Sequence, residues 1–527
     1  MSADTTSVDV GTQAPPEEFD EVAYLLAYPD IAESIRAGAC KSALEHYNLY
    51  GESEQRLADS RYLRARATGD TAQFVPSHVD LVYTSRSLRC FVSGWAEDRD
   101  DAPLGHIAVT TPSDPSSNRR LVAIARCRRQ DVEAQRSTSV QSLLGYWSIM
   151  NLSQPLGTDR RLQITLTVGF ERRTFTCEAQ VVSDEQLRDL AIGYLAGTRY
   201  FGDPTVDAFL QLDAGIGRSL IDLNMEVSRK VVAGAYVARY GKTRAAYDGS
   251  IIVCLYGKPD FLMLQAALFS RCKHHERYEF IYVSNSPELT ERLVKDATIA
   301  CRIYDVSITL VLLPGNAGFG AANNAAVNAA RTDRILLVNP DVLPRDMEWP
   351  ARHTEAVQNL PREQTALFGV PLYYDDGSLM HGGMYFAIED GLSFSNQRII
   401  RRDVMRTEHY GKGAPPQARE FLVPRPVPAV TGAFMSIDRA WFEFLGGFSP
   451  EFIFGHYEDG DLCLRSLEAG RPAWIHDLPF WHLESKGATH QSIHDGGRLV
   501  NRWNLTSRWS GFVKDELNGQ HPRLFST

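Results

Sequence analysis

Residues 250–257 read SIIVCLYG, a nearly uninterrupted apolar run that ends in glycine. Such a run predicts a strand that is buried on both faces, which is typical of a parallel sheet covered by helices. Two similar runs follow, EFIYV at 279–283 and ITLVLL at 308–313, and a helical pattern over 261–269 separates the first two strands. This alternation predicts a parallel α/β sheet, a fold that binds ligands beyond the carboxyl ends of its strands.

Outside this sheet the pattern of apolar and polar residues changes several times along the chain, which predicts a multidomain protein. We expect a disordered tail over residues 1–18, a small helical module over 19–70 and a β-sandwich over 76–183, where short apolar runs alternate with turn residues. A helical connector over 184–248 then leads into the α/β domain at 249–515. The N-terminal domains show no convergent set of catalytic residue types, so we place the chemistry in the α/β domain.

The overall composition is that of an ordinary globular protein, because 44% of the 527 residues are hydrophobic and 23% are charged. This balance excludes a mostly disordered chain, a collagen-like repeat and a coiled-coil rod. The formal net charge of −10 argues against a general nucleic-acid binder, which would carry a basic surplus. A local site for an anionic substrate remains compatible with that charge.

No stretch approaches the ~20 continuous apolar residues that a membrane-spanning helix needs, and residues 1–16 lack a signal-peptide pattern. The eight cysteines are scattered without a CxxC pair, which predicts free thiols rather than a zinc site or a disulfide framework. These features predict a cytoplasmic protein without a transmembrane segment. Peripheral contact with the inner face of the membrane stays open.

A segment rich in glycine and alanine follows the third strand, since residues 316–324 read NAGFGAANN. Its glycines allow close backbone approach, and its small residues predict a helix whose N-terminal amides face a phosphate or a nucleoside. Tight helix packing explains the same composition. The segment alone does not distinguish the two interpretations.

A fourth apolar strand ends in two polar side chains. Residues 334–342 read RILLVNPDV, which brings Asn339 and Asp341 to the edge of the sheet. A carboxylate in this place suits a hard divalent cation that is shared with a diphosphate. An aspartate that caps the next turn is the alternative, and the spacing favours neither.

Four further segments lie nearer the C-terminus: VTGAFM at 430–435, LGGFSP at 445–450, FGHYEDGDLCLR at 454–465 and FWH at 480–482. Together with the two segments above, they resemble the inverting family 2 glycosyltransferases of the GT-A fold, a Rossmann-like α/β fold. Rhamnosyl- and galactofuranosyl-transferase-like members are the most similar. The resemblance covers about residues 249–510 and rests on four motifs in order: Asn-Ala-Gly-Phe-Gly, Asn-Pro-Asp, Gly-Gly-Phe, and Glu-Asp-Gly-Asp-Leu followed by a histidine.

The resemblance implies a role for each matched polar residue. Asp341 corresponds to the carboxylate that holds a divalent metal, Mn²⁺ or Mg²⁺, on the donor diphosphate, with Asn339 in place of the first acid of that motif. His482 corresponds to a late metal-ligating histidine. Asp459 corresponds to the catalytic base, and Glu458 supports it or orients the acceptor. Inverting transfer needs one base and a cation that neutralises the departing diphosphate, which agrees with this set.

The resemblance also suggests binding residues on both sides of the transferred sugar. On the donor side we expect Tyr256, Asn285, Ser286, Asn316, Gly318, Phe319, Gly320, Asn323 and Asn339. On the acceptor side we expect Gly432, Gly447 and His456. The family usually carries an aspartate that binds the nucleotide base where this chain has Ser284, so the identity of the base stays open.

These patterns predict an enzyme that moves a hexosyl or deoxyhexosyl unit from a nucleotide-diphosphate sugar to a glycan, lipid-linked or protein acceptor, in bacterial surface polysaccharide or glycoconjugate synthesis. A sugar-binding or scaffold protein built on a degenerate transferase domain is the alternative, because Asn339 and Ser284 depart from the family pattern. A nucleotidyltransferase is disfavoured by the lack of a basic glycine-rich signature near the first strand. The acids Glu458 and Asp459 would also stabilise a helix N-terminus, and both roles are compatible.

Overall fold

The computed structural model describes residues 19–51 except 20, 22–23, 26–27 and 37–39; 76–97; 104–110; 123–135; 143–168 except 153 and 157–159; and 171–516 except 396–397, 422, 485, 488 and 490. The chain divides into two compact units, of which the larger comprises Ser77–Ala96, His106–Leu166 and Thr174–Thr527. The smaller comprises Met1–Pro76, Glu97–Gly105 and Thr167–Arg173. The predicted tail over 1–18 and the second part of the predicted helical module, 52–70, lie outside the described residues.

The larger unit is organised around a nine-stranded sheet with the order β20-β22-β15-β21-β13-β10-β11-β12-β9. Its centre consists of four parallel strands: β10 (Gly249–Leu255), β11 (Tyr278–Ser284), β12 (Ile308–Leu312) and β13 (Arg334–Val338). The predicted parallel α/β sheet is therefore confirmed. The strand order reverses at β10, which lies between β11 and β13, and such a switch point opens a crevice at the carboxyl ends of the strands.

The remaining five strands extend this sheet on both sides. They are β9 (Tyr236–Tyr240), β15 (Leu367–Gly369), β20 (Arg425–Val427), β21 (Phe434–Asp438) and β22 (Ala473–Ile475). β9 and β21 run antiparallel to their central neighbours β12 and β13. The sheet is thus mixed: besides the four central strands, only β15 and β22 among its described strands pair in parallel.

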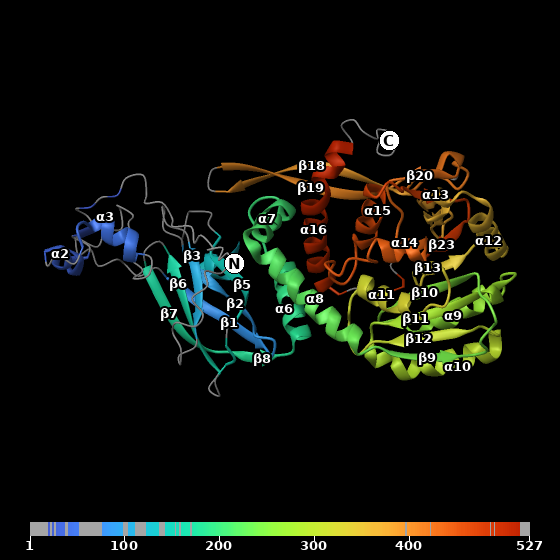
Figure 1. Ribbon diagram of the computed structural model, residues 1–527, viewed down its shortest axis with the longest axis horizontal. Coiled ribbons are helices and arrows are strands. Elements are labelled where there is room, and N and C mark those ends of the chain that lie inside the picture. Colours follow the sequence, from blue (N-terminus) through green and yellow to red (C-terminus); the bar gives the residue numbers. More distant parts are fainter. Residues whose placement is uncertain are drawn as a thin grey trace, which may run out of the picture. The chain divides into compact units, whose positions relative to one another are not determined.

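Helices cover the central strands on both faces, as the continuous apolar runs predict (Figure 1). Ile251 and Val253 of β10 pack in one apolar cluster with α9 (Asp260–Phe269) and α10 (Thr290–Tyr304). Ile252 and Cys254 pack in the other with the helices on the opposite face. Those are α6 (Asp184–Gly197), α8 (Gly217–Ala233), α11 (Phe319–Ala329), α15 (Glu458–Glu468) and α16 (Ile493–Asp515). Alternate side chains of the same strand therefore stabilise two separate layers.

The segment predicted as a helical connector is helical but also contributes to the sheet. It contains α6, α7 (Pro204–Gln211) and α8, and then β9, which pairs with β12. Ser183 caps α6 through a reciprocal pair of hydrogen bonds with Gln186. The sequence analysis did not predict β9.

Residues 77–182 form short strands, as the alternating pattern predicts. One sheet has the order β4-β5-β2-β1-β8 and the other β3-β6-β7. Their strands are β1 (Ser77–Ser85), β2 (Arg89–Ala96), β3 (Leu104–Thr110), β4 (Ala125–Cys127), β5 (Gly145–Asn151), β6 (Arg161–Val168), β7 (Glu171–Glu178) and β8 (Gln180–Val182). Phe91 and Trp147 of the first sheet are fully buried in the cluster that contains α6 and α8. The sandwich arrangement and the domain boundaries stay predictions.

A small sheet and a long hairpin complete the surroundings of the crevice. The sheet has the order β14-β23-β16-β17, with β14 (Val342–Pro344), β16 (Leu372–Tyr373), β17 (Leu379–His381) and β23 (Phe480–His482). The hairpin pairs β18 (Met384–Ser395) with β19 (Arg398–His409) and extends past α16 as a ribbon (Figure 1). Shorter helices are α5 (Gln130–Gln135), α12 (Trp349–Asn359), α13 (Arg362–Thr365) and α14 (Arg439–Phe444).

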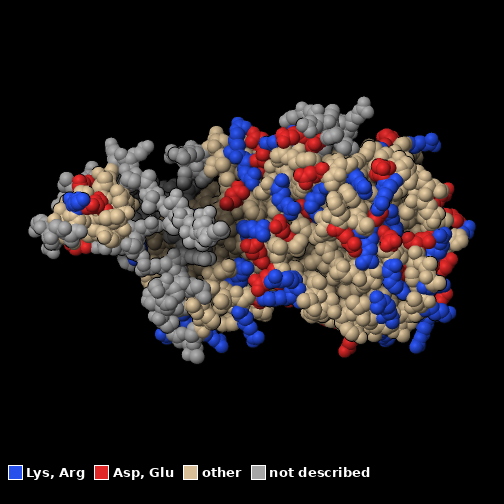
Figure 2. All heavy atoms as spheres, viewed as in Figure 1, with Lys and Arg blue, Asp and Glu red and all other residues tan. Residues whose placement is uncertain are grey.

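In the smaller unit, α2 (Pro29–Arg36) and α3 (Ala43–His46) enclose an apolar cluster of Tyr24, Tyr28, Ile31 and Ala43. All eight cysteines are free thiols, as predicted. Among the described residues, no helix is both long enough and apolar enough to cross a membrane. Basic and acidic side chains are interspersed on the face of the larger unit shown in Figure 2.

Candidate active site

The structure brings Asp341 and His482 together, although 140 residues separate them in the sequence. The pairing of β14 with β23 places Val342 opposite His482, and the His482 Nε2 lies 3.5 Å from the Asp341 Oδ1. The other oxygen of Asp341 accepts hydrogen bonds from the backbone amides of Lys486 (3.1 Å) and Gly487 (2.9 Å). A side chain at Gly487 would clash with this carboxylate, because its Cβ would lie 2.8 Å from Oδ1.

The electrostatics of this pair favour an ionised carboxylate. Burial by itself would raise the pKa of Asp341, but the hydrogen bond and charge of His482, with the Gly487 amide, hold it below its ordinary value. The His482 Nδ1 is buried and has no hydrogen-bond partner among the described residues. A carboxylate next to an imidazole with an unused buried nitrogen is a donor set that fits a divalent cation such as Mn²⁺.

Two protein ligands do not fill a coordination sphere. Among the described residues, no group of three or more His, Cys, Asp or Glu side chains is arranged to hold a metal. A cation on Asp341 and His482 therefore needs further ligands besides such side chains. A diphosphate supplies oxygen ligands.

The glycine-rich segment connects β12 to α11. Its conformation depends on Asn285 at the end of β11, whose Oδ1 accepts from the Ala317 amide (3.1 Å) and whose Nδ2 donates to the Gly318 carbonyl (3.2 Å). Asn316 adds a hydrogen bond from the Gly318 amide to its own Oδ1 (2.9 Å). Gly318 has a φ of 85°, and its Cβ position is 3.2 Å from the backbone of Phe454, so only glycine fits.

The other predicted donor residues surround this segment. Tyr256 follows β10, and its ring stands edge-on to that of His494 with 5.5 Å between centroids. Ser286 accepts a hydrogen bond from the Gly257 amide (2.9 Å). The remaining residues form the start of α11 and the end of β13: Phe319, Gly320, Asn323, whose Nδ2 donates to the Phe319 carbonyl (2.9 Å), and Asn339, whose carbonyl accepts from Gln265 (3.0 Å). Most of these polar groups hold backbone in place, and their contact with a donor stays a prediction.

Glu458 and Asp459 begin α15, and the structure places them in different surroundings. The Asp459 carboxylate accepts from the Gly432 amide (2.8 Å) through one oxygen and from the Gly460 amide (2.8 Å) through the other. Glu458 is buried, and its Oε2 has no hydrogen-bond partner among the described residues. Burial, with the charges of Asp459 and Asp461, raises the pKa of Glu458 well above its ordinary value. One carboxyl of the pair can therefore carry a proton while its neighbour accepts one.

The loop that leads into α15 has an unusual backbone. Phe454, His456 and Tyr457 have φ values of 59°, 77° and 72°, although none of them is glycine. Left-handed conformations of bulky residues are uncommon and cluster at functional sites. We call residues 453–457 the base loop.

Asn501 of α16 holds the base loop in this conformation. Its Oδ1 accepts from the Ile453 amide (2.7 Å). Its Nδ2 donates to the carbonyls of Ile453 (2.9 Å), Gly455 (2.7 Å) and His456 (3.1 Å). One fully buried side chain therefore satisfies four backbone groups of a strained loop.

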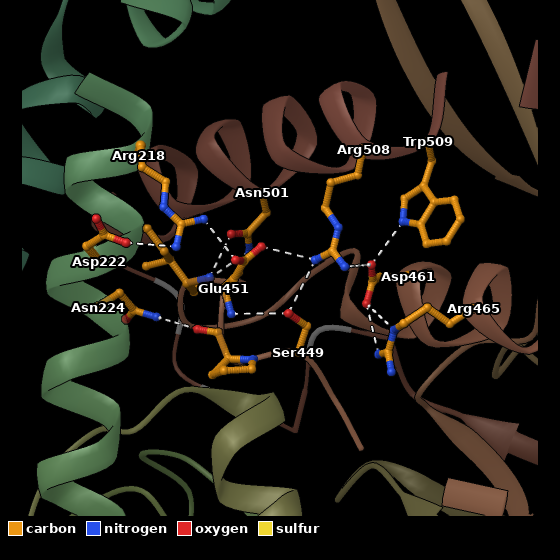
Figure 3. Close-up of polar contacts among 12 residues, drawn as sticks. Arg218, Asp222, Asn224, Ser449, Glu451, Asp461, Arg465, Asn501, Arg508 and Trp509 are labelled. Atoms are coloured by element: carbon orange, nitrogen blue, oxygen red, sulfur yellow. Dashed lines mark hydrogen bonds and ion pairs between the residues drawn. The ribbon is translucent and has the colours of Figure 1, made fainter. Parts of the chain in front are cut away.

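Further polar contacts fix the segment before the base loop between two helices (Figure 3). Glu451 accepts from Arg218 of α8 (2.9 Å) and from Arg508 of α16 (3.1 Å). Asn224 of α8 donates to the Pro450 carbonyl (3.3 Å). Helix α8, which lies in the segment predicted to be a connector, thus directly supports the segment that precedes the base loop.

The first turn of α15 is anchored in the same way (Figure 3). Asp461 is fully buried and accepts from the Trp509 indole (2.9 Å) and from Arg465 (2.9 Å). Arg508 lies 3.5 Å from its Oδ1. This carboxylate is fully partnered, unlike that of Glu458, so it serves the structure.

The three residues predicted on the acceptor side occupy different places. Gly432 lies against Asp459, as its hydrogen bond shows. His456 belongs to the base loop, and its side chain is exposed. Gly447 forms a turn with a φ of 69°, where its Cβ would lie 2.8 Å from the Asn324 side chain. Its contact with an acceptor stays a prediction.

No role was predicted from the sequence for Asn501, nor for three further polar residues near the site, His381, His409 and Arg188. His381 and His409 share an Nδ1–Nδ1 contact of 2.8 Å, and burial lowers the pKa of His409 to about 4. Asp459, Glu484 and His482 all act electrostatically on His409. Arg188 of α6 donates to the Asn316 carbonyl (3.0 Å) and lies 4.8 Å from the centre of the Phe454 ring. Gly382 and Gly383, which directly follow His381, were the only feature of the local sequence that drew attention to any of these residues.

Part of this chain matches a known protein family. Residues 250–413 match the family model of glycosyl transferase family 2. The match includes the glycine-rich segment and Asp341, and it ends before Asp459 and His482. It supports a family 2 glycosyltransferase domain of GT-A-like α/β fold in this part of the chain.

One curated relative is the uncharacterized protein y4gI of Sinorhizobium fredii. It is 29% identical over 174 residues, which are 33% of this chain and 18% of that protein. The matched stretch thus spans less than a fifth of that relative.

Two solved glycosyltransferases are similar in structure. One is GalNAc-T7 with UDP, GalNAc and Mn²⁺, at 14% identity and a TM-score of 0.36, covering 52% of this chain and 51% of that one. The other is a mannosyltransferase of Pyrobaculum calidifontis in complex with GDP-Man and Mn²⁺, at 13% identity and a TM-score of 0.30, covering 63% of this chain and 88% of that one.

Proposed function

We propose that this protein is a metal-dependent, inverting glycosyltransferase that uses a nucleotide-diphosphate sugar as donor. The observation that carries the proposal is the pairing of Asp341 with His482 at the switch point of a sheet whose segment 250–413 matches family 2. Segment 432–433 links the two parts of the site, since the Gly432 amide donates to Asp459 (2.8 Å) and the Ala433 carbonyl accepts from the Asn339 amide (2.8 Å). This link supports a donor diphosphate and a base that lie in neighbouring parts of one site.

In this proposal Asp341 and His482 hold a divalent cation, Mn²⁺ or Mg²⁺. The cation would neutralise charge on the departing nucleoside diphosphate. The glycine-rich segment, kept rigid by Asn285 and Asn316, presents backbone at the donor side. The start of α11 adds the partial positive charge of a helix N-terminus.

Asp459 acts as general base for the acceptor hydroxyl. Its carboxylate takes the proton as the acceptor oxygen bonds to the anomeric carbon, and the bond from that carbon to the diphosphate oxygen breaks on the opposite face. The Gly432 and Gly460 amides fix the orientation of the carboxylate. Burial and the neighbouring charges raise the pKa of Glu458, which favours its protonated form and so disfavours a second negative charge beside the base.

The finer assignments follow from the resemblance of the motifs. We propose a hexosyl or deoxyhexosyl donor and a glycan, lipid-linked or protein acceptor, within bacterial surface polysaccharide or glycoconjugate synthesis. The rhamnosyl- and galactofuranosyl-transferase-like pattern of motifs supports this choice. The proposed location is the cytoplasm.

The test uses the full chain with a panel of UDP-, GDP- and dTDP-sugars, with Mn²⁺, Mg²⁺ or a chelator. We expect metal-dependent release of the nucleoside diphosphate from at least one donor, and proton NMR of the first-formed sugar product should show an inverted anomeric configuration. A sugar-binding or scaffold protein would bind a sugar without releasing nucleotide. Failure to bind any nucleotide sugar with either metal contradicts the proposal.

A further inference from the structure

A cavity of about 460 Å³ opens next to the base loop, and no residue of the proposed donor or metal site lines it. It lies among α6, α7 and α16, and its polar wall carries three arginines. Its lining comprises Leu195, Ala196, Thr198, Arg199, Tyr200, Pro204, Thr205, Tyr457, Asp495, Arg498, Leu499 and Arg502. The volume is within the range of sites for small ligands.

The charge of this cavity contrasts with that of the chain. The lining contains three arginines and one acidic residue, Asp495, in a protein whose formal net charge is −10. Such a local surplus of positive charge in a concave site concentrates anions. Guanidinium groups also match phosphate and carboxylate oxygens in geometry.

The arginines are held in place but keep donors for a ligand. Arg502 donates its Nε to the Met405 carbonyl (2.7 Å), and its Nη2 lies 3.7 Å from the Glu389 carboxylate. Arg498 donates through Nη2 to Asp495 (3.3 Å), and its side chain is 56% exposed. Arg199 uses only its Nη1 in the hydrogen bonds to Gly197 (3.2 Å) and Thr198 (2.9 Å) that the structure shows. Each guanidinium has five N–H donors, so several remain for an anion.

Tyr457 connects the cavity to the reaction centre. It lines the cavity, belongs to the base loop, and directly precedes Glu458 in the chain. The charges of Arg498, Arg502 and Asp459 all act on its hydroxyl. A ligand in the cavity therefore lies beside the residues that start α15.

We propose that this cavity binds an anionic group of the acceptor, a phosphate or a carboxylate, while the acceptor hydroxyl lies at Asp459. The assignment rests on the proposed function and extends it, because it specifies an acidic acceptor such as a phosphorylated glycan or one that contains a uronic acid. In the proposed function the donor diphosphate has its own site at Asp341, which does not line this cavity. The arginines would therefore select the acceptor rather than the donor.

The experiment measures binding of small anions to the full chain in a chelator without donor, by saturation-transfer NMR or calorimetry. The probes are glycerol 3-phosphate for the phosphate source, glucuronate for the carboxylate source and glucose as the neutral control. We expect saturable binding of at least one anion, weakened at least tenfold in Arg498→Gln and in the double variant with Arg199→Gln. The matched control is Arg302→Gln, an exposed arginine on α10, which should leave binding unchanged, as should Asp341→Asn.

Saturable binding of neither anion, or binding that both arginine variants retain, overturns the inference. The result is separate from the test of the proposed function, because no donor or metal is present. Anion binding without any donor hydrolysis would refute the transferase and leave the anion site. Donor hydrolysis without arginine-dependent anion binding would refute the site and leave the transferase.

Discussion

The first residues of the glycine-rich segment, 316–319, contact the base loop, residues 453–457. The two segments reach their conformations by different means. Gly318 adopts a positive φ without cost, and Asn316, Asn285 and the distant Arg188 hold its neighbours. The base loop forces three bulky residues into the left-handed region, and it depends on Asn501, which lies 44 residues or more beyond it. Tertiary contacts hold both segments, but only the base loop needs them to keep bulky residues in a strained conformation.

This difference predicts which substitutions affect turnover and which affect binding. Changes on the base side should lower the rate with donor binding intact. Changes at Asp341 should abolish donor binding. The following variants test that division, beginning with the largest effect.

Asp459→Asn should lower turnover by roughly 10²–10⁴, because it removes the proton acceptor and keeps the size of the side chain. Donor affinity should survive, since Asp341 and His482 are unchanged. Nucleoside diphosphate release and donor binding, measured on one sample, test this. Glu458→Gln is the matched control and should have a milder effect, and near-normal turnover of Asp459→Asn would exclude this residue as the base.

Asn501→Asp keeps the acceptor for the Ile453 amide and removes the three hydrogen bonds that Nδ2 donates. The base loop should relax, and turnover should fall by about 10²-fold, as misplacement of a catalytic group by about an ångström does. The donor KM should change much less. Asn504→Ala is the control on the same helix, since the Asn504 Nδ2 makes no hydrogen bond with the described residues.

An equal loss in the two asparagine variants would mean that α16 has only a general structural role. The split between kcat and KM distinguishes this outcome from loss of folded protein. A melting curve for each variant completes the comparison.

Glu458→Gln should change how stability depends on pH. The folded-state pKa of Glu458 is raised above the reference value of 4.5, so the folded protein binds more protons than the unfolded chain in the interval above that value. The stability that this proton confers is complete below pH 4.5 and declines as pH rises toward the folded-state pKa, by up to about 1.4 kcal/mol per pH unit. Melting temperatures across this interval should fall more steeply for the wild type than for Glu458→Gln. If the melting temperatures of the two proteins change with pH in parallel, the pKa of Glu458 is not raised in the folded protein.

Trp509→Phe should have the smallest effect on catalysis. It removes the indole hydrogen bond to Asp461 but leaves the bond from Arg465, so we expect a loss of about 1–3 kcal/mol in the free energy of unfolding. Turnover per folded molecule should stay close to that of the wild type. A loss of turnover without a loss of stability would mean that Asp461 takes part in the reaction and is not only structural.

The central sheet was predictable because each of its parallel strands is a continuous apolar run with helical periodicity beside it. β9 was not, because YVARY alternates and is half exposed, and it pairs with β12 across nearly 70 residues. That Asp341 and His482 lie close together could be inferred only from the resemblance of the motifs. Their proximity depends on the pairing of β14 with β23, which no local pattern predicts. Arg188 and Asn501 carry no local signal, because they bind the backbone of distant loops.

We propose that Asp341 and His482 form the metal and diphosphate site, while Asp459 serves separately as the base. Calorimetric titration of the preferred nucleotide sugar into wild type, Asp341→Asn, His482→Gln and Asp459→Asn, each with and without Mn²⁺, tests it most directly. We predict metal-dependent binding to wild type and Asp459→Asn, and loss of that dependence in the other two variants. Unchanged affinity and metal dependence in Asp341→Asn would exclude Asp341 as a ligand of the cation.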